Sequence, residues 1–142
     1  MNILFVLPTL SNGGAERVAS ILATKMSENH KVEIFTLEQP ETEPYILSSK
    51  VILKSAGIKA NRENKLKALL SFIITFCQQK VALKKEIKIF KPDFVISFLP
   101  KADILIFAIF NKNFKWIASE RNDPSRRNML ERKILNYIYK KT

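Results

Sequence analysis

The chain has 142 residues, and 46% of them are hydrophobic, as expected for one globular domain with a single core. Its formal net charge of +11 is unusual, because residues 61–142 hold eighteen basic and seven acidic residues, whereas residues 1–60 hold six of each. This asymmetry predicts an anionic partner, either a membrane surface or a nucleic acid.

The rest of the composition excludes several classes of protein. One cysteine, Cys77, cannot form an internal disulfide, which indicates a reducing compartment. No residues have the spacing of metal ligands, so we expect neither a metal site nor a cofactor. The start of the chain lacks the basic segment of a signal peptide, and no stretch reaches the roughly 18 to 20 apolar residues that span a bilayer. We therefore expect a cytoplasmic protein.

Residues 1–28 predict a buried strand, a glycine turn and an amphipathic helix. Ile3–Leu7 is a continuous apolar run, typical of a parallel strand covered on both faces. Gly13 and Gly14 follow, and adjacent glycines allow positive φ and close approach of a ligand. The helix then begins with an amino end that favours a phosphate or carboxylate. The alternative is a tight turn with a helix cap and no ligand. The apolar residues of the helix are spaced by three and four: Val18, Ile21, Leu22 and Met26.

Two short strands follow, and the only histidine lies before the first of them. Lys31–Leu37 predicts the second strand, and Val51–Leu53 predicts a third. His30 stands at the turn into the second strand, on the side of the sheet away from the strand carboxyl ends. Because ligands of α/β sheets bind at those carboxyl ends, we do not expect His30 to be catalytic.

The segment Asn61–Lys91 predicts one long helix, or two with a break. Leu66–Cys77 is apolar nearly all round, and a basic stretch, Lys80–Lys91, follows. This pattern fits a helix that lies in a membrane interface with its lysines at anionic headgroups. It fits equally a core helix with a solvated lysine face, and the two interpretations remain open. The residues predicted to contact a membrane are Lys65, Lys67, Phe72, Phe76, Lys80, Lys84 and Lys88.

The last third of the chain continues the alternation of strands and helices. Phe94–Phe98 and Lys115–Ala118 predict strands, while Ile104–Phe110 and Met129–Lys141 predict helices. Strands that alternate with helices predict an α/β fold, with a Rossmann-like, doubly wound parallel sheet.

Three polar loops should meet at the carboxyl edge of this sheet, namely Asn12–Glu16, Leu99–Asp103 and Ser119–Asp123. The third loop packs two carboxylates, a guanidinium and an amide into four residues, which suits sugar hydroxyls or a phosphate oxygen. The alternative is a cap on the last helix, with Asp123 as N-cap. We assign Asp123 to the cap, and Glu120 with Arg121 to function.

Three motifs resemble the family 4 glycosyltransferases, which are retaining sugar-nucleotide enzymes with the GT-B fold. The motifs are Gly13-Gly14-Ala15-Glu16-Arg17-Val18, then Val95-Ile96-Ser97-Phe98-Leu99 with Ile104-Leu105, and Ser119-Glu120-Arg121-Asn122-Asp123-Pro124. They follow one another in family order and cover the chain from end to end. The chain is most similar to members that build bacterial surface polysaccharides. Many relatives have a histidine near Ser119, and this chain has none there.

The resemblance implies that residues 1–142 are the N-terminal, acceptor-side domain of a two-domain enzyme, incomplete at its C-terminus. The donor-binding domain, with the principal catalytic residues, would be absent. The whole enzyme would transfer a sugar from a nucleotide sugar, expected to be a UDP-sugar, to a saccharide on a polyprenyl diphosphate at the inner face of the plasma membrane. The resemblance places Asn12, Gly13 and Gly14 near the donor phosphate and sugar, and Glu16, Asp103, Glu120, Arg121 and Asn122 at the acceptor.

Two other hypotheses are a non-catalytic, basic polyanion-binding domain and an inactive truncated gene product. The first is supported by charge alone. Because the sequence contains no nucleic-acid-binding motif, and most aromatic residues are phenylalanines within apolar runs, we expect no nucleic-acid partner.

Overall fold

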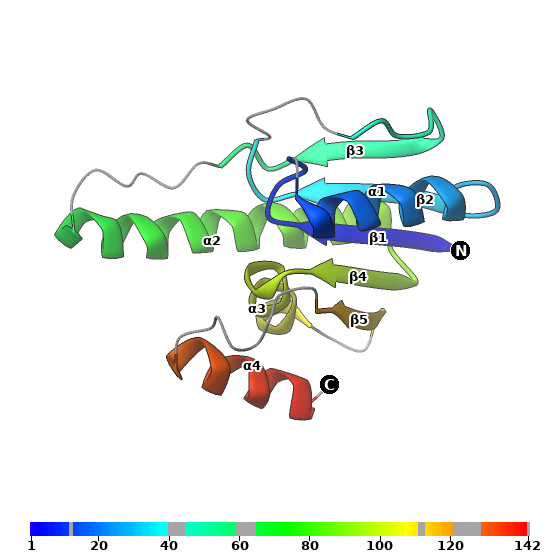
Figure 1. Ribbon diagram of the computed structural model, residues 1–142. Helices are drawn as coiled ribbons and strands as arrows, with labels where there is room; N and C mark the ends of the chain where they lie inside the picture. Colours follow the sequence, from blue (N-terminus) through cyan, green and yellow to red (C-terminus); the bar gives the residue numbers. More distant parts are fainter. Residues whose placement is uncertain (12, 40–44, 59–64, 111–112, 121–128, 142) are drawn as a thin grey trace.

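The computed structural model describes residues 1–11, 13–39, 45–58, 65–110, 113–120 and 129–141, and Figure 1 shows their arrangement. Strands and helices alternate in the order expected from the sequence. They are β1 (Asn2–Leu7), α1 (Gly14–Met26), β2 (Lys31–Thr36), β3 (Val51–Ser55), α2 (Lys65–Phe90), β4 (Phe94–Phe98), α3 (Pro100–Ile109), β5 (Lys115–Ser119) and α4 (Met129–Lys141).

The five strands form one parallel sheet in the order β3-β2-β1-β4-β5. β1 lies at the centre, where Ile3 pairs with Val32 of β2 on one side and with Phe94 of β4 on the other. The chain winds outward from β1 through β2 to β3, and α2 then carries it back across to β4. The sheet is therefore doubly wound, as predicted, with its topological switch point between β1 and β4.

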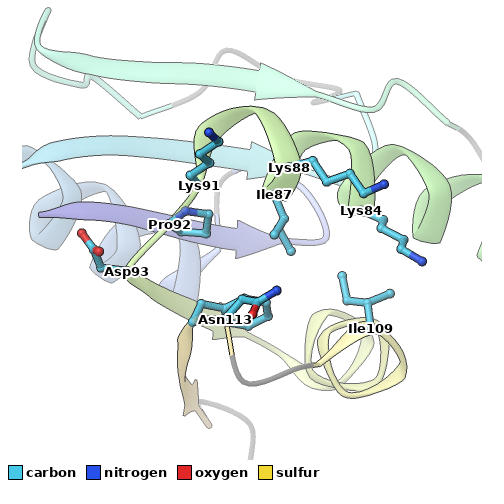
Figure 2. Close-up of a pocket in the computed structure, with 9 residues that line it drawn as sticks. Lys84, Ile87, Lys88, Lys91, Pro92, Asp93, Ile109 and Asn113 are labelled. Carbon is cyan, nitrogen blue, oxygen red and sulfur yellow. The ribbon is translucent and has the colours of Figure 1, made fainter.

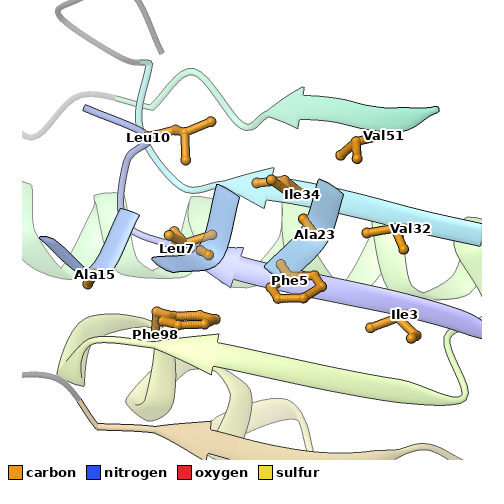
Figure 3. Close-up of a cluster of buried hydrophobic side chains, with 11 residues drawn as sticks. Ile3, Phe5, Leu7, Leu10, Ala15, Ala23, Val32, Ile34, Val51 and Phe98 are labelled. Atoms are coloured by element: carbon orange, nitrogen blue, oxygen red, sulfur yellow. The ribbon is translucent and has the colours of Figure 1, made fainter. Parts of the chain in front are cut away.

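Helices cover both faces of the sheet, and the alternation of side chains along β1 explains the two cores. Ile3, Phe5 and Leu7 point to the face covered by α1, where they meet small residues of that helix such as Ala23 (Figure 3). Leu4 and Val6 point to the opposite face, beneath α2 and α3. A strand buried on both faces is apolar at nearly every position, which is why the apolar run Ile3–Leu7 predicted such a strand.

Helix α2 is one continuous helix, whereas the sequence was compatible with one long helix or with two helices and a break. Its first turns extend past the carboxyl ends of the strands, to the left in Figure 1. Its buried face is partly polar, since Thr75, Gln79 and Glu86 are buried alongside Leu83 and Phe90. No helix among the described ranges has both the length and the apolarity needed to cross a membrane.

Candidate functional site

The loops after β1, β4 and β5 lie at one edge of the sheet because these three strands are parallel neighbours. Val6 pairs with Ser97 near the ends of β1 and β4, and Phe98 pairs with Ser119 at the ends of β4 and β5. The register thus brings the starts of α1 and α3 to the topological switch point, with Glu120 one strand further along. This is the edge where α/β sheets bind ligands.

The turn into α1 does not use the positive φ that its two glycines would allow. Gly13 is the N-cap residue, with φ −98° and ψ 160°, and no side chain caps the helix through a hydrogen bond. Among the described glycines only Gly57 has positive φ, so the two glycines of the turn are not needed for a left-handed conformation. The hydroxyl of Tyr45 donates a 3.1 Å hydrogen bond to the carbonyl of Gly13, which ties the segment before β3 to this turn.

Glu16 lies in the first turn of α1 and is 8% exposed. Its carboxylate occupies the space beside Gly13, because a Cβ built on Gly13 would be 2.1 Å from Oε2 of Glu16. A carboxylate here stabilises the amino end of its own helix. Glu16 is thus nearly buried beside Gly13, and its assignment to the acceptor stays a prediction.

Gly14, in contrast, faces open space. Apart from its two chain neighbours and the backbone of its own helix, no described atom lies within 4 Å of a Cβ built on this residue, and Gly14 is exposed. Neither packing nor φ therefore explains the absence of a side chain. A bare backbone at the amino end of a helix leaves room for a ligand to approach its N–H groups.

Leu99 carries backbone strain at the switch point. It has φ 72° and ψ 148°, a conformation that costs a non-glycine residue roughly 1–3 kcal/mol. It begins α3, where its carbonyl accepts the N–H groups of Ala102 and Asp103. Nearby, Lys101 pairs with Glu38 from the loop after β2. The sequence showed no sign of this strain, since Leu99-Pro100 predicts only a non-helical residue before proline.

Asp103 is not at the surface, which corrects its assignment to the acceptor. It is fully buried, and its two carboxylate oxygens accept hydrogen bonds from Ser97 Oγ at 2.5 Å and Tyr139 Oη at 2.6 Å. The indole of Trp116 donates to the same Ser97 hydroxyl at 2.7 Å. Asp103 therefore joins β4, β5 and α4 to α3, and it has no open side for a sugar.

Of the remaining polar residues of the predicted site, the structure describes Glu120. Glu120 is exposed and directly follows Ser119, the last residue of the strand. Asn12, Arg121 and Asn122 lie outside the described residues, as does the predicted cap residue Asp123. Their assignments stay predictions.

The predicted membrane residues divide into two groups on α2. Phe72 is 59% exposed, and Lys84 and Lys88 are exposed, whereas Lys80 is half-buried. Phe76 is half-buried and packs against the core beneath the helix. Lys65 and Lys67 belong to α2, but their side chains are not described.

A buried charge cluster lies beneath α2 that the sequence pattern did not predict. Glu33 is fully buried on β2, and its carboxylate lies 3.0 Å from the ammonium of Lys54, which also bonds Glu86 at 2.7 Å. Burial raises the pKa of Glu33 to about 7, against the lowering effect of Lys54. The hydrogen bond to Glu86 raises the pKa of Lys54. A glutamate within an apolar strand was the available signal for this cluster.

This chain is similar to known enzymes, although no protein-family model matches it. The chain is 32% identical over 108 residues to a Campylobacter jejuni enzyme named GalNAc-alpha-(1->4)-GalNAc-alpha-(1->3)-diNAcBac-PP-undecaprenol alpha-1,4-N-acetyl-D-galactosaminyltransferase. Among solved structures, sucrose-phosphate synthase from Thermosynechococcus elongatus superposes on 96% of the chain with a TM-score of 0.68 and 12% identity, which is evidence for the fold.

Both similarities concern only a part of the larger enzymes. The C. jejuni match covers 76% of this chain and 28% of the enzyme, and the structural match covers 39% of the synthase chain. The doubly wound sheet and these two similarities agree with one another. The chain is a Rossmann-like GT-B domain that resembles the N-terminal domain of family 4 glycosyltransferases.

Proposed function

We propose that this chain is the acceptor-side domain of a two-domain, retaining glycosyltransferase. The observation that carries the proposal is the switch point, where the amino end of α1 is open at Gly14 and the neighbouring loop is strained at Leu99. Such a helix end suits a sugar phosphate, and strained residues cluster where ligands are held. The similarity to a named transferase supports the same class of reaction.

The proposed donor is a nucleotide sugar, with a UDP-sugar as the first choice, and its phosphate and sugar approach residues 12–14. The proposed acceptor is a saccharide on a polyprenyl diphosphate, which is supported by the undecaprenol-PP in the name of the C. jejuni enzyme. Residues 120–122, after β5, orient acceptor hydroxyls. The donor-binding domain and the principal catalytic groups belong to a second domain. The product contributes to a surface polysaccharide, and the reaction needs no bound metal.

In this proposal the enzyme acts at the inner face of the plasma membrane, and the outer face of α2 makes the contact. This face is defined by Leu70, Ile73, Ile74, Cys77 and Val81, which repeat at helical spacing and are all exposed. Exposed lysines continue along the same helix at positions 84, 85 and 88. Apolar side chains followed by lysines suit an anionic bilayer, in which the former enter the interface and the latter meet phosphates.

The proposal is tested by joining the chain to the donor-binding domain of a similar enzyme. We expect transfer from one of a panel of UDP-sugars to an undecaprenyl-diphosphate-linked saccharide, and no transfer by the 142-residue chain alone. The reason is that closure between two domains assembles such a site. Gly14→Val in the joined enzyme is the matched control and should abolish transfer.

Two results would contradict the proposal. Robust transfer by the isolated chain would show that no second domain is required. A folded joined enzyme that transfers no sugar, while the parent enzyme of the donor domain is active under the same conditions, would exclude this chain as an acceptor-side domain.

A further inference from the structure

A separate pocket lies at the opposite, amino-terminal edge of the sheet, away from the loops described above. It has a volume of about 300 Å³, the lower end of the range for small-ligand sites. Figure 2 shows α2 on one side of it, with Ile109 of α3 and Asn113 facing the helix. The lining residues are Lys84, Ile87, Lys88, Lys91, Pro92, Asp93, Ile109, Asn113 and Phe114.

The charge of this pocket is positive and largely uncompensated. Lys84, Lys88 and Lys91 lie at helical spacing on α2 and at its end, and none of them makes an ion pair with another described residue. The single lining carboxylate, Asp93, accepts the backbone N–H of Asn2 at 2.7 Å, which holds it against β1. The lining therefore has an excess of two positive charges, which matches a phosphate dianion.

The backbone supplies a second, independent observation at Lys91. Helix α2 ends there in the left-handed region, with φ 50°. Glycine is the common residue at such a position because a side chain is strained there. The favourable effect of cations on a helix carboxyl end is confined to its last turn, so it accounts for Lys88 but not for Lys84. Lys91 thus adds a third positive charge to the lining, at a position that strains its backbone.

The pocket also has an apolar wall, made by the half-buried Ile87 and Ile109 and the buried Phe114. We propose that this pocket binds a phosphate group, with the lysines around the phosphate and the apolar wall against the carbon atoms that it esterifies. The phosphate comes from a lipid headgroup or from a soluble phosphate ester. The pocket and the carboxyl-edge loops lie at opposite edges of the sheet, so a soluble phosphate ester here would be independent of the proposed glycosyl transfer. A lipid headgroup would instead rest on the proposed membrane contact, because Lys84 and Lys88 belong to both.

Isoleucine-methyl NMR of the 142-residue chain tests the proposal with inorganic pyrophosphate as the soluble probe. We expect saturable shifts of the Ile87 and Ile109 methyl groups, while the methyl group of Ile21 on α1 stays unmoved. Lys84→Gln with Lys88→Gln should weaken binding by about tenfold or more, since it removes two charge-assisted contacts. Lys85→Gln is the matched control, because this exposed lysine of the same helix does not line the pocket.

Lys91→Gly separates a binding role from a structural one. Glycine relieves the left-handed backbone, so the melting temperature should stay the same or rise while pyrophosphate affinity falls. A lower melting temperature with unchanged affinity would overturn the proposal. The proposal would also be overturned if the Ile87 and Ile109 methyl groups stayed unmoved both with pyrophosphate and with the lipid nanodiscs described next. Equal weakening of pyrophosphate binding by Lys85→Gln would overturn it as well.

A second arm identifies the source of the phosphate, with nanodiscs of phosphatidylglycerol or of phosphatidylcholine as probes. Shifts of Ile109 with phosphatidylglycerol that pyrophosphate displaces assign a lipid headgroup. Shifts with pyrophosphate alone assign a soluble phosphate ester. Ile73→Gln with Val81→Gln, which alters the outer face of α2, should leave the pyrophosphate shifts intact. A failure of the membrane contact is thereby distinguished from a failure of this pocket.

Discussion

At the scale of single residues, Glu33 places a carboxylate on the covered face of the sheet, where water cannot solvate it. The side chain is fully buried, and Glu86 lies close enough to raise its pKa further, so one lysine serves two carboxylates. Burial of an incompletely paired charge is costly, and the folded protein therefore holds the proton of Glu33 up to about pH 7.

This gives the protein a pH-dependent stability with a defined sign. The pKa of Glu33 rises from 4.5 in the unfolded chain to about 7 in the fold, so the folded state binds the extra proton between these values. The contribution of this group is complete below pH 4.5 and is lost as the pH rises through 7. The loss should be about 1–3 kcal/mol of unfolding free energy.

Glu33→Gln should remove this slope and make the protein more stable than the wild type at pH 8, because the amide keeps the shape without the charge. Urea unfolding at pH 5, 6, 7 and 8 measures the difference. Glu28→Gln, at an exposed carboxylate beyond the end of α1, is the control and should leave the slope unchanged. Parallel profiles of wild type and Glu33→Gln would show that Glu33 stays ionised in the fold.

Gly14 offers a residue-scale test of ligand approach. Because a Cβ there meets no described atom beyond its chain neighbours and its own helix backbone, Gly14→Ala should stabilise the protein by about 0.5–1 kcal/mol through the lower entropy of the unfolded chain. Gly13→Ala should gain less, since its Cβ would displace the carboxylate of Glu16. Thermal melting compares the two variants.

The activity of the same variant decides the role of Gly14. In the joined enzyme, Gly14→Ala should lower kcat/KM although the protein is more stable, because the methyl group takes space that the donor needs. A stabilised variant with undiminished transfer would mean that no ligand approaches this residue.

At the scale of elements, the sequence predicts the described strands and helices, but not the order of the strands or which polar side chains are buried. The strands are predictable because parallel strands buried on both faces are continuously apolar, as in β1. The strand order and the burial of Asp103 cannot be predicted in this way, because both depend on contacts between distant segments. Tyr139 on α4 and Ser97 on β4 lie 36 and 6 residues from Asp103, and only the fold brings them together. The position of Asp103 after a strand end suggested that it binds a ligand, but in the fold its carboxylate holds neighbouring elements together.

Helix α2 shows the same limit, because its apolar residues occur on opposite sides. The sequence could not distinguish Phe76, which packs inward, from Phe72, which is exposed. A helix that buries Thr75, Gln79 and Glu86 while it exposes isoleucines has more apolar surface outside than a solvated helix would keep. An interfacial helix needs such an exposed apolar surface, whereas an ordinary core helix does not.

Ile73→Gln with Val81→Gln tests that interpretation. These two residues are 51% and 68% exposed, so the double variant should fold normally and lose most of its binding to anionic vesicles. Ile21→Gln, at an isoleucine of α1 that is 59% exposed, is the matched control and should bind as the wild type does. Vesicle sedimentation at high salt, where charge attraction is screened, measures the apolar part. Equal sedimentation of all three proteins would exclude α2 as the anchor.

At the scale of the whole molecule, the net charge of +11 is carried by residues 61–142, which contain both the lysine-rich part of α2 and α4. Long-range attraction of this kind is screened within about 10 Å at 0.1 M salt and within about 3 Å at 1 M. Binding to phosphatidylglycerol vesicles should therefore fall steeply between about 50 and 500 mM salt. The weak binding that remains at high salt would come from the apolar outer face of α2.

The same titration separates a membrane protein from a general polyanion binder. Phosphatidylcholine vesicles remove the charge and keep the bilayer, whereas single-stranded DNA keeps the charge and removes the bilayer. A membrane contact predicts that phosphatidylglycerol outcompetes an equal concentration of DNA phosphate, because only the bilayer accepts the apolar side chains of α2. If DNA competes equally and Ile73→Gln with Val81→Gln changes neither affinity, charge alone drives binding, and the chain is a polyanion binder without a membrane role.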